Sequence, residues 1–485
     1  MSEVLDALIV GAGFAGVAAA IELKEAGLNN FIIAEKTDGI SGTWYDNHYP
    51  GAACDVPSAL YSYSFAPNPD WSRRFSPWHE IMGYVENVVD GYGLREKIRH
   101  NTEIISGRFD EKRGVWRIRT KNGDTFTARF LIVSVAILGT PKMPDIEGMD
   151  SFSGPAFHSA RWDRNVDLKG KRLSVIGSAA SAVQIVPEVA KICTEVNVFQ
   201  RTPNWIIPRM DRAYKRFEKA MFRVFPITQK LVRAALYLYL DRWFFNVFAR
   251  EGRVNAHFRR MAERFRRKKV KDPDLRAKLT PDYPIGCKRV LLSDDYYEAL
   301  QRENVNLVTT PIRRIVPQGI ELEDGRVVES DILVYATGFK ATEFMPGLEL
   351  EGLGGARLSE WRRRPRAYKG ITVGDMPNAF FLLGPNTGLG HASMILMIEA
   401  QTPYMRRLIK ATPNPGWFVP REEPVRRYND EIQNTLSGRI WATSCQSWYK
   451  TKDGDIPTLW PYTCHKYKQM MEVDDRQAYR FVTPS

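Results

Sequence analysis

The sequence predicts an α/β protein with two Rossmann-type dinucleotide-binding domains and a helical insertion in the second. Two glycine-rich turns each follow an apolar strand and precede a helix. In both copies, 24 residues separate the first glycine from a polar residue that ends the next strand. Residues 209–283 interrupt this plan with a basic segment that has few turn residues. Two nested copies of one plan are far more specific than a single glycine motif, and 485 residues suffice for both.

The first copy begins with the apolar stretch Ala7–Val10 and a helical stretch, Val17–Ala26. The strand Phe31–Ala34 follows and ends at Glu35. The turn between the first strand and the helix reads Gly11-Ala12-Gly13-Phe14-Ala15-Gly16. Its first glycine permits the tight turn, its second lets a pyrophosphate approach the helix N-terminus, and its third allows close helix–strand packing.

The second copy runs from the strand Arg172–Ile176 through Gly177-Ser178-Ala179-Ala180-Ser181-Ala182 to the strand Val196–Gln200. It ends at Arg201-Thr202, where the first copy has Glu35. A carboxylate suits free ribose hydroxyls, whereas an arginine suits a 2′-phosphate. We therefore expect FAD in the first unit and NADPH or NADP+ in the second. Ala179 replaces the middle glycine and is a departure from the pattern.

Composition excludes several classes of protein. Apolar residues make up 44% and charged residues 26%, which is unlike a disordered, collagen-like or coiled-coil chain. The net charge is +13, and residues 209–289 supply 23 Lys and Arg against 8 Asp and Glu, or +15. The remainder is close to −2, so no nucleic-acid partner is expected.

The termini and cysteines suggest a compartment. The N-terminus lacks the basic start of a secretory signal, and no apolar run is long enough for a transmembrane span. The five cysteines are scattered without a C-x-x-C pair, which predicts no disulfide framework, no metal site and no redox dithiol. We expect a cytoplasmic location. The cysteines are Cys54, Cys193, Cys287, Cys445 and Cys464.

Residues 209–283 are rich in Arg, Phe, Tyr and Leu and predict several amphipathic helices. Apolar residues recur at helical spacing at Leu231, Ala234, Ala235, Leu238 and Phe245. Two interpretations remain open. The insertion either caps the second unit, or it makes a weak membrane-surface contact or admits an apolar substrate.

Two further stretches carry a family resemblance. The segment from Phe152 to Asp163 matches F-x-G-x-x-x-H-x-x-x-W-[P/D] at every fixed position. The segment from Gly42 to Asp55 is similar to [A/G]-G-x-W-x-x-x-x-[F/Y]-P-[G/M]-x-x-x-D, with Ser41 at the position usually held by Ala or Gly. With Lys288-Arg289 and Ser447-Trp448-Tyr449, in the family's order, the chain resembles the type I Baeyer–Villiger monooxygenases of the flavin-containing monooxygenase superfamily.

The resemblance implies an activity. A C4a-peroxyflavin would insert one atom of O2 next to a ketone carbonyl and give an ester or lactone, with NADPH as reductant. Arg289 would hold the peroxide anionic, and Asp55 would hold Arg289. Arg201 and Lys288 would clamp the 2′-phosphate, whereas His158 and Trp162 would set domain orientation.

The resemblance also implies a set of cofactor-binding residues. These are Gly11, Gly13, Phe14, Gly16, Glu35, Thr43, Trp44, Asp55, Tyr61, Gly177, Ser178, Ser181, Arg201, Thr202, Lys288, Asn386 and Trp448.

The expected domains are an FAD-binding domain from residues 1–141 and 341–485, an NADP-binding domain from 142–208 and 284–340, and the helical insertion 209–283. Two rival functions remain. One is oxygenation of sulfur or nitrogen, against which Trp162-Asp163, Arg289 and Asp55 argue. The other is a flavin-bound redox sensor without turnover. The sequence specifies neither the ketone nor the oligomeric state.

Overall fold

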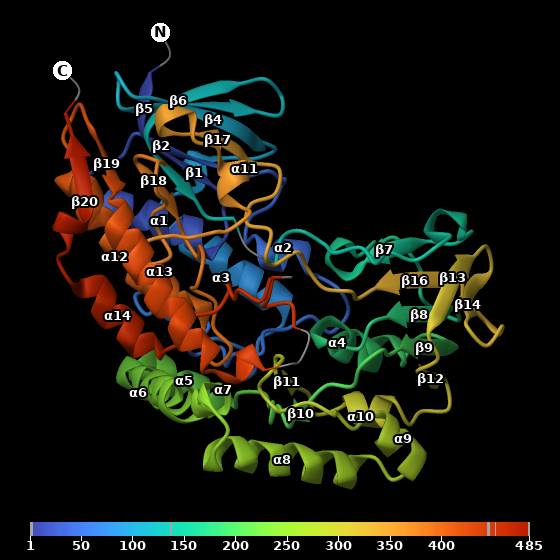
Figure 1. Cartoon of the computed structure of the whole chain (residues 1–485). Coiled ribbons are helices and arrows are strands. Elements are labelled where there is room, and N and C mark those ends of the chain that lie inside the picture. The colour runs from blue at the N-terminus through green and yellow to red at the C-terminus, as the bar shows by residue number, and fades with distance from the viewer. Residues whose placement is uncertain (1–2, 136–137, 444–446, 452, 484–485) are drawn as a thin grey trace.

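The computed structural model describes residues 3–135, 138–443, 447–451 and 453–483. Cys445, named above, lies outside these ranges. Two sheets organise the chain. Figure 1 shows the larger sheet at the top and the smaller one at the right, with the insertion at the lower end.

The larger sheet has the strand order β17-β4-β5-β6-β1-β2-β3, and β18 pairs with β6. Strand β1 is parallel to β2 and β6, whereas β4, β5 and β6 form an antiparallel meander. The last four residues of β1 are buried because helices and other strands cover both faces. The bounds are β1 Val4–Val10, β2 Phe31–Ala34, β3 Ile98–Arg99, β4 Ile104–Asp110, β5 Val115–Thr120, β6 Thr125–Val133, β17 Glu349–Glu351 and β18 Ala379–Phe381.

The smaller sheet is parallel throughout, in the order β12-β9-β8-β16-β7. A three-stranded antiparallel sheet, β13-β14-β15, and two short strand pairs, β10-β11 and β19-β20, complete the strands of the described residues. The bounds are β7 Ala156–His158, β8 Arg172–Ile176, β9 Glu195–Phe199, β10 Ile206–Ile207, β11 Leu291–Leu292, β12 Val305–Val308, β13 Ile312–Val316, β14 Gly319–Leu322, β15 Val327–Glu329, β16 Ile332–Tyr335, β19 Trp417–Pro420 and β20 Tyr479–Val482.

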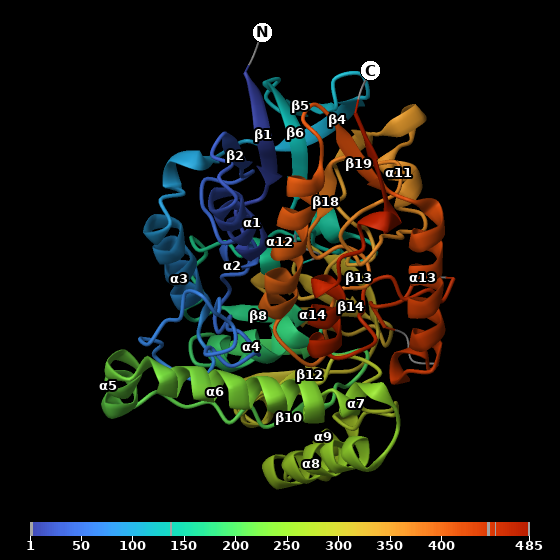
Figure 2. The same ribbon diagram turned by 90° about the vertical axis from the view of Figure 1, so that its left-hand side faces the viewer.

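Each glycine turn leads into a helix, as the sequence predicts. Helix α1 follows the first turn and packs beside α12, and α4 follows the second turn. Helix α12 also packs against α14, below the larger sheet in Figure 2. The bounds are α1 Phe14–Glu25, α2 Thr43–Asp46, α3 Trp78–Gly91, α4 Ala180–Val189, α10 Tyr296–Ala299, α11 Leu358–Trp361, α12 Met394–Ala411, α13 Glu422–Ser437 and α14 Cys464–Glu472.

Between residues 209 and 283 the chain forms helices and a short π-helix, labelled η4. Helices α5 and α6 run across the lower end of the molecule, and α8 lies below them (Figure 2). No helix of the described residues is long and apolar enough to cross a membrane. The bounds are α5 Arg216–Val224, α6 Pro226–Leu238, η4 Tyr239–Phe244, α7 Asn246–Ala249, α8 Arg253–Lys269 and α9 Pro273–Lys278.

The chain crosses between the two sheets twice, and the crossings lie side by side. The backbone N–H of Lys142 donates to the carbonyl of Gly338 at 2.9 Å. The Thr337 hydroxyl donates to the carbonyl of Lys142 at 2.6 Å. These bonds tie the crossings together beside both glycine turns.

Cys54, Cys193 and Cys464 are buried free thiols, whereas Cys287 is disulfide-bonded. The sequence did not predict a disulfide at Cys287. The expected cytoplasmic location stays a prediction.

Candidate active site

The first glycine turn is closed by contacts that leave no room for side chains. Gly11 has φ +98°, and a Cβ on Gly16 would lie 1.9 Å from the carbonyl oxygen of Gly11. The Ser134 hydroxyl, at the end of β6, is 2.6 Å from the carbonyl oxygen of Val10 and 3.0 Å from that of Gly11. The sequence did not predict Ser134 as a site residue. The one sequence feature that could have indicated it is its position directly after an apolar strand. Gly13 precedes α1 and lies against Gly42, so two backbone segments frame the turn.

Glu35 lies beside this turn and is buried. Its Oε2 accepts a hydrogen bond from the backbone N–H of Ala12 at 2.8 Å, and its Oε1 accepts from Thr37. The carboxylate is therefore fixed at the end of β2, next to the N-terminus of α1. A buried acceptor in that position suits a ribose hydroxyl.

Aromatic side chains line the same region. The indole N–H of Trp44 donates to the Tyr61 hydroxyl at 3.0 Å, and the two rings meet edge to face at 5.8 Å. Phe14 contacts Tyr61 with ring centroids 5.3 Å apart. Thr43 begins α2, directly before Trp44. The structure thus brings Phe14, Trp44 and Tyr61 into one cluster beside the first turn.

The second turn repeats the geometry of the first. Gly177 has φ +118°, and a Cβ there would lie 2.4 Å from the carbonyl oxygen of Ala336. The Ser178 hydroxyl donates to the carbonyl of Thr202 at 3.2 Å. Ser181 lies in the first turn of α4, where backbone N–H groups point outward.

Two cations stand next to the second turn. Arg201 is exposed at the end of β9, and the ammonium of Lys288 lies 4.4 Å from the centre of the Tyr283 ring. Burial, followed by the charge of Arg201, lowers the pKa of Lys288, so the two cations lie near each other. Among the described residues neither forms an ion pair within 4.0 Å. Two cations without a carboxylate in ion-pair contact suit a phosphate group.

Arg289 and Asp55 form an ion pair. The guanidinium donates from Nε at 3.0 Å and from Nη2 at 2.5 Å, and both bonds go to Asp55 Oδ2. The two side chains are 33% and 29% exposed, so the pair is sheltered yet can be reached by a ligand. The Asp55 carboxylate raises the pKa of Arg289, which stays charged.

Tyr449 completes this group. It interacts electrostatically with Arg289, and burial raises the pKa of its phenol. Its hydroxyl is buried without a hydrogen-bond partner among the described residues. The sequence singled out the neighbouring Trp448, which is exposed and whose ring centroid lies 4.6 Å from that of Tyr449.

The segment that carries Asp55 is fastened to the second unit. Gln184 of α4 donates from Nε2 to the carbonyl of Ala53 at 2.9 Å and accepts from the Tyr49 hydroxyl at 3.0 Å. Gly51 has φ +80°, and a Cβ there would lie 2.3 Å from the carbonyl oxygen of Gln184. This contact sets how Asp55 lies relative to the second glycine turn.

The two family-like segments also contact each other. Asp46 pairs with Arg161 at 3.1 Å, and His48 Nε2 lies 3.1 Å from the carbonyl oxygen of Trp162. His158 Nδ1 accepts from the Ala160 N–H at 3.1 Å, so its Nε2 donates to the carbonyl of Gly338 at 2.9 Å. His158 therefore spans the crossing between the sheets.

Asn386 is buried, and its amide is committed to the protein. Nδ2 donates to the carbonyls of Ile456 at 2.7 Å and Leu459 at 3.0 Å. The side chain thus holds the segment that contains Ile456 and Leu459.

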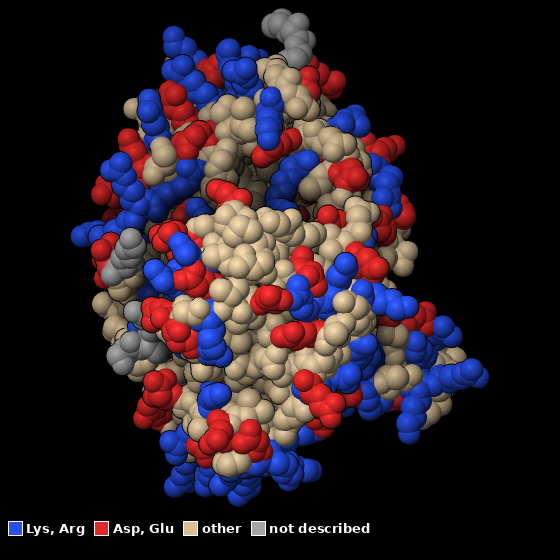
Figure 3. All heavy atoms as spheres, turned by 90° about the vertical axis from the view of Figure 1, so that its right-hand side faces the viewer, with Lys and Arg blue, Asp and Glu red and all other residues tan. Residues whose placement is uncertain are grey.

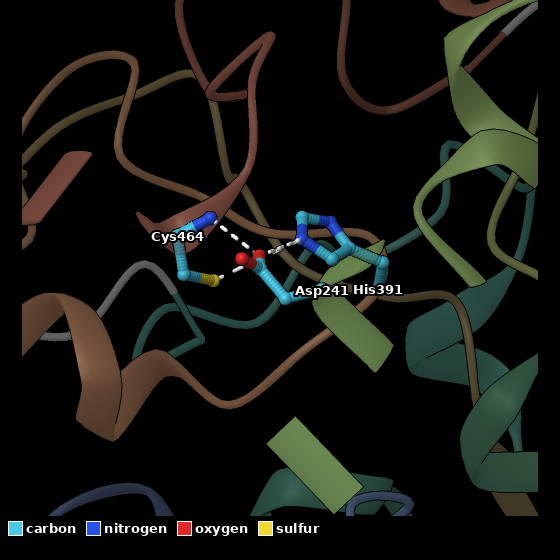
Figure 4. Close-up of side chains that lie close together, drawn as sticks. All are labelled: Asp241, His391 and Cys464. Atoms are coloured by element: carbon cyan, nitrogen blue, oxygen red, sulfur yellow. Dashed lines mark hydrogen bonds and ion pairs between the residues drawn. The ribbon is translucent and has the colours of Figure 1, made fainter. Parts of the chain in front are cut away.

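A buried cluster of Asp241, His391 and Cys464 joins η4, the loop after β18 and α14 (Figure 4). Asp241 Oδ1 lies 3.3 Å from His391 Nε2 and accepts from the Cys464 backbone N–H at 2.5 Å. Oδ2 accepts from the His465 backbone N–H at 3.1 Å. These residue types can bind a metal ion, but Asp241 is used as a cap for α14. We interpret the cluster as a structural contact, called the joint below, that holds η4, the His391 loop and α14 together.

Comparison with known proteins identifies the class. A family model described as pyridine nucleotide-disulphide oxidoreductase matches residues 8–217. A Baeyer-Villiger monooxygenase of Pseudomonas aeruginosa is 41% identical over 480 residues, which are 98% of this chain and 91% of that protein. One of Streptomyces coelicolor is 40% identical over 98% of this chain and 92% of its own length.

Solved structures agree. A steroid monooxygenase bound to NADP is 30% identical, with a TM-score of 0.85 and 96% of each chain covered. OTEMO in complex with FAD and NADP is 28% identical, with a TM-score of 0.89 over 99% of this chain and 100% of that one. Fold and site thus define an oxidoreductase with two dinucleotide-binding domains. The chain belongs to the Baeyer–Villiger monooxygenase family.

Proposed function

We propose that this protein is an NADPH- and FAD-dependent monooxygenase that inserts one oxygen atom beside a ketone carbonyl, giving an ester or lactone. The observation that carries this proposal is the Arg289–Asp55 ion pair, which lies where the two dinucleotide units meet. A small-molecule ketone and O2 are its substrates.

The described residues fit both cofactors. The first turn leaves space only for backbone at Gly11 and Gly16, and Glu35 offers a buried acceptor for a ribose. The unpaired cations Arg201 and Lys288 suit a 2′-phosphate beside the second turn. When bound, NADPH supplies a hydride and reduced FAD with O2 supplies the oxygen atom.

Arg289 supplies a permanent positive charge near the reacting oxygen. Negative charge develops on oxygen as it attacks a ketone carbonyl, and a fixed cation stabilises that charge without reorganising. Both of its bonds go to one oxygen of Asp55, which fixes the plane of the guanidinium. Asp55 is thus a positioning residue. The Tyr449 hydroxyl lies beside the same guanidinium.

We also propose the domain division given above. The larger sheet draws on residues 4–133 and 349–381, and the smaller one on residues 156–335. The helices of the insertion fall between the two short strands β10 and β11.

The test is NADPH oxidation across cyclic, linear, aryl and steroid-like ketones, with product identification. Ester or lactone formed in proportion to NADPH consumed supports the proposal. A thioether that is oxygenated while every ketone is spared would favour the sulfur-oxygenating alternative. FAD binding with no ketone-dependent NADPH consumption would favour a redox sensor.

A further inference from the structure

Exposed apolar side chains are concentrated in one part of the described chain. Eighteen large hydrophobic residues are exposed, and eleven of them fall between residues 210 and 243. Single exposed hydrophobic residues are normal, but a concentrated set marks an interaction surface. We call this set the apolar face. It comprises Met210, Phe217, Met221, Val224, Phe225, Ile227, Leu231, Val232, Leu238, Tyr239 and Trp243.

Helix α6 has the reverse of the usual polarity. Two of its polar side chains face the protein: Gln229 Nε2 donates to the carbonyl of Asn68 at 2.6 Å, and Arg233 Nη1 donates to that of Ser62 at 2.8 Å. Ile227, Leu231 and Leu238, one helical stripe, are 60%, 63% and 55% exposed. The sequence placed Leu231 and Leu238 at helical spacing but left open whether the insertion faces the protein or a membrane surface. A surface helix normally turns its apolar stripe inward.

Helix α5 shows the same arrangement. Phe217 and Val224 are 63% and 67% exposed, and Met221 lies between them at helical spacing. Phe222 alone is buried. Two consecutive helices thus turn apolar stripes outward, in the lower part of the molecule just above α8 (Figures 1 and 2).

Aromatic residues continue the surface along η4. Tyr239 and Trp243 are exposed, with ring centroids 5.4 Å apart. Tyrosine and tryptophan favour the boundary between water and the lipid interior, because their rings are apolar and their tips polar. The same π-helix carries buried Asp241, so these rings stand on a segment fixed to α14.

The surroundings are basic. From Arg216 to Leu240 the chain has five basic residues and one acidic residue, Glu218, which pairs with Arg212. Helix α8 has Lys and Arg throughout its last turn. Figure 3 shows Lys and Arg gathered at the lower end of the molecule.

We propose that the apolar face docks peripherally on an anionic lipid surface. Apolar side chains of α5, α6 and η4 would enter the headgroup boundary while the surrounding cations bind lipid phosphates. A symmetric pairing of two copies would instead bring two basic surrounds together, and like charges repel. This proposal goes beyond the oxygenase function and does not depend on it.

The test is co-sedimentation of the full-length holoenzyme with vesicles. One set contains phosphatidylcholine alone and the other adds phosphatidylglycerol. We expect binding to the anionic vesicles that weakens with added salt. The double variant Ile227→Glu/Leu231→Glu should bind at least about tenfold less, since two buried apolar side chains are lost. Its content of bound FAD should stay unchanged, which checks folding.

Val473→Glu is the matched control, because Val473 is 54% exposed but lies outside the apolar face. It should bind vesicles like the wild type. An equal loss of vesicle binding in both variants would overturn the proposal. A wild-type protein that does not bind anionic vesicles would also overturn it. A wild-type dimer that the double variant converts to monomers, without vesicle binding, would assign the face to a second copy instead.

Discussion

Arg289 and Asp55 lie 234 positions apart in the chain, yet Nε and Nη2 of Arg289 both donate to Oδ2 of Asp55, at 3.0 and 2.5 Å. One carboxylate oxygen thus fixes the plane of the guanidinium. Gln184 of α4 holds the segment that carries Asp55. The position of the ion pair therefore depends on how the two dinucleotide units pack together.

Arg289→Ala should abolish ketone oxygenation while NADPH oxidation continues, releasing hydrogen peroxide. Loss of one preorganised charged donor typically costs about 10²–10³-fold in turnover. Product formation and peroxide release are measured together, with Arg302→Ala as the exposed arginine control. An Arg289→Ala enzyme with wild-type ester yield would remove this residue from the chemistry.

Lys288 should make NADPH use sensitive to alkaline pH. Burial and Arg201 lower its pKa, so its charge is present at low pH and is lost as pH rises through that lowered pKa. The rate constant of flavin reduction at limiting NADPH should fall as pH rises through the lowered pKa of Lys288. This fall should occur at a lower pH than the ordinary pKa of a lysine would give. Lys288→Arg should remove the fall, because arginine keeps its charge.

The same cations should set the choice between NADPH and NADH. Removing one charge-assisted bond to the 2′-phosphate with Arg201→Ala should lower the preference for NADPH by about 10–100-fold. The ratio of kcat/KM for the two reductants measures this. An unchanged ratio would place the 2′-phosphate elsewhere.

Gly51→Ala should lower both stability and NADPH use. A Cβ at this position would lie 2.3 Å from the carbonyl oxygen of Gln184, at φ +80°. We expect a loss of about 1–3 kcal/mol in the free energy of unfolding, and a higher KM for NADPH. Gly83→Ala is the control, because Gly83 lies inside α3 with nothing within 4 Å of an added Cβ. That change should be neutral or slightly stabilising.

Asp241 should contribute stability that acid removes. Burial raises its pKa, but hydrogen bonds from His391 and the N–H groups of Cys464 and His465 outweigh burial, and the net pKa is lowered. This contribution is present above about pH 4 and is lost as pH falls through the lowered pKa. Urea unfolding between pH 5 and pH 3 should therefore depend on pH more steeply in the wild type than in Asp241→Asn.

The joint also predicts how Asp241→Asn behaves at neutral pH. The variant should lose about 1–3 kcal/mol in the free energy of unfolding, because an amide NH2 would face a backbone donor. A chelator should leave the wild-type melting temperature unchanged. A clear drop on chelation would show instead that Asp241, His391 and Cys464 hold a metal ion.

Local signals made much of this protein predictable. The strands Phe31–Ala34 and Arg172–Ile176 were predicted with the bounds found for β2 and β8, because the first apolar run ends at Glu35 and the second at Gly177. Tyr449 and Gln184 escaped prediction as site residues. Their roles arise from contacts with Arg289 and Ala53 in distant parts of the chain.

By itself the sequence determined the two glycine turns, the charges that follow them and the family motifs, because each of these depends only on residues that are close together in the sequence. Only the tertiary structure decided which side of α6 meets water. Helical spacing identifies a stripe but not its direction. Gln229 and Arg233 find backbone carbonyl partners in a segment more than 150 residues away, and this pairing turns the stripe of Ile227, Leu231 and Leu238 outward.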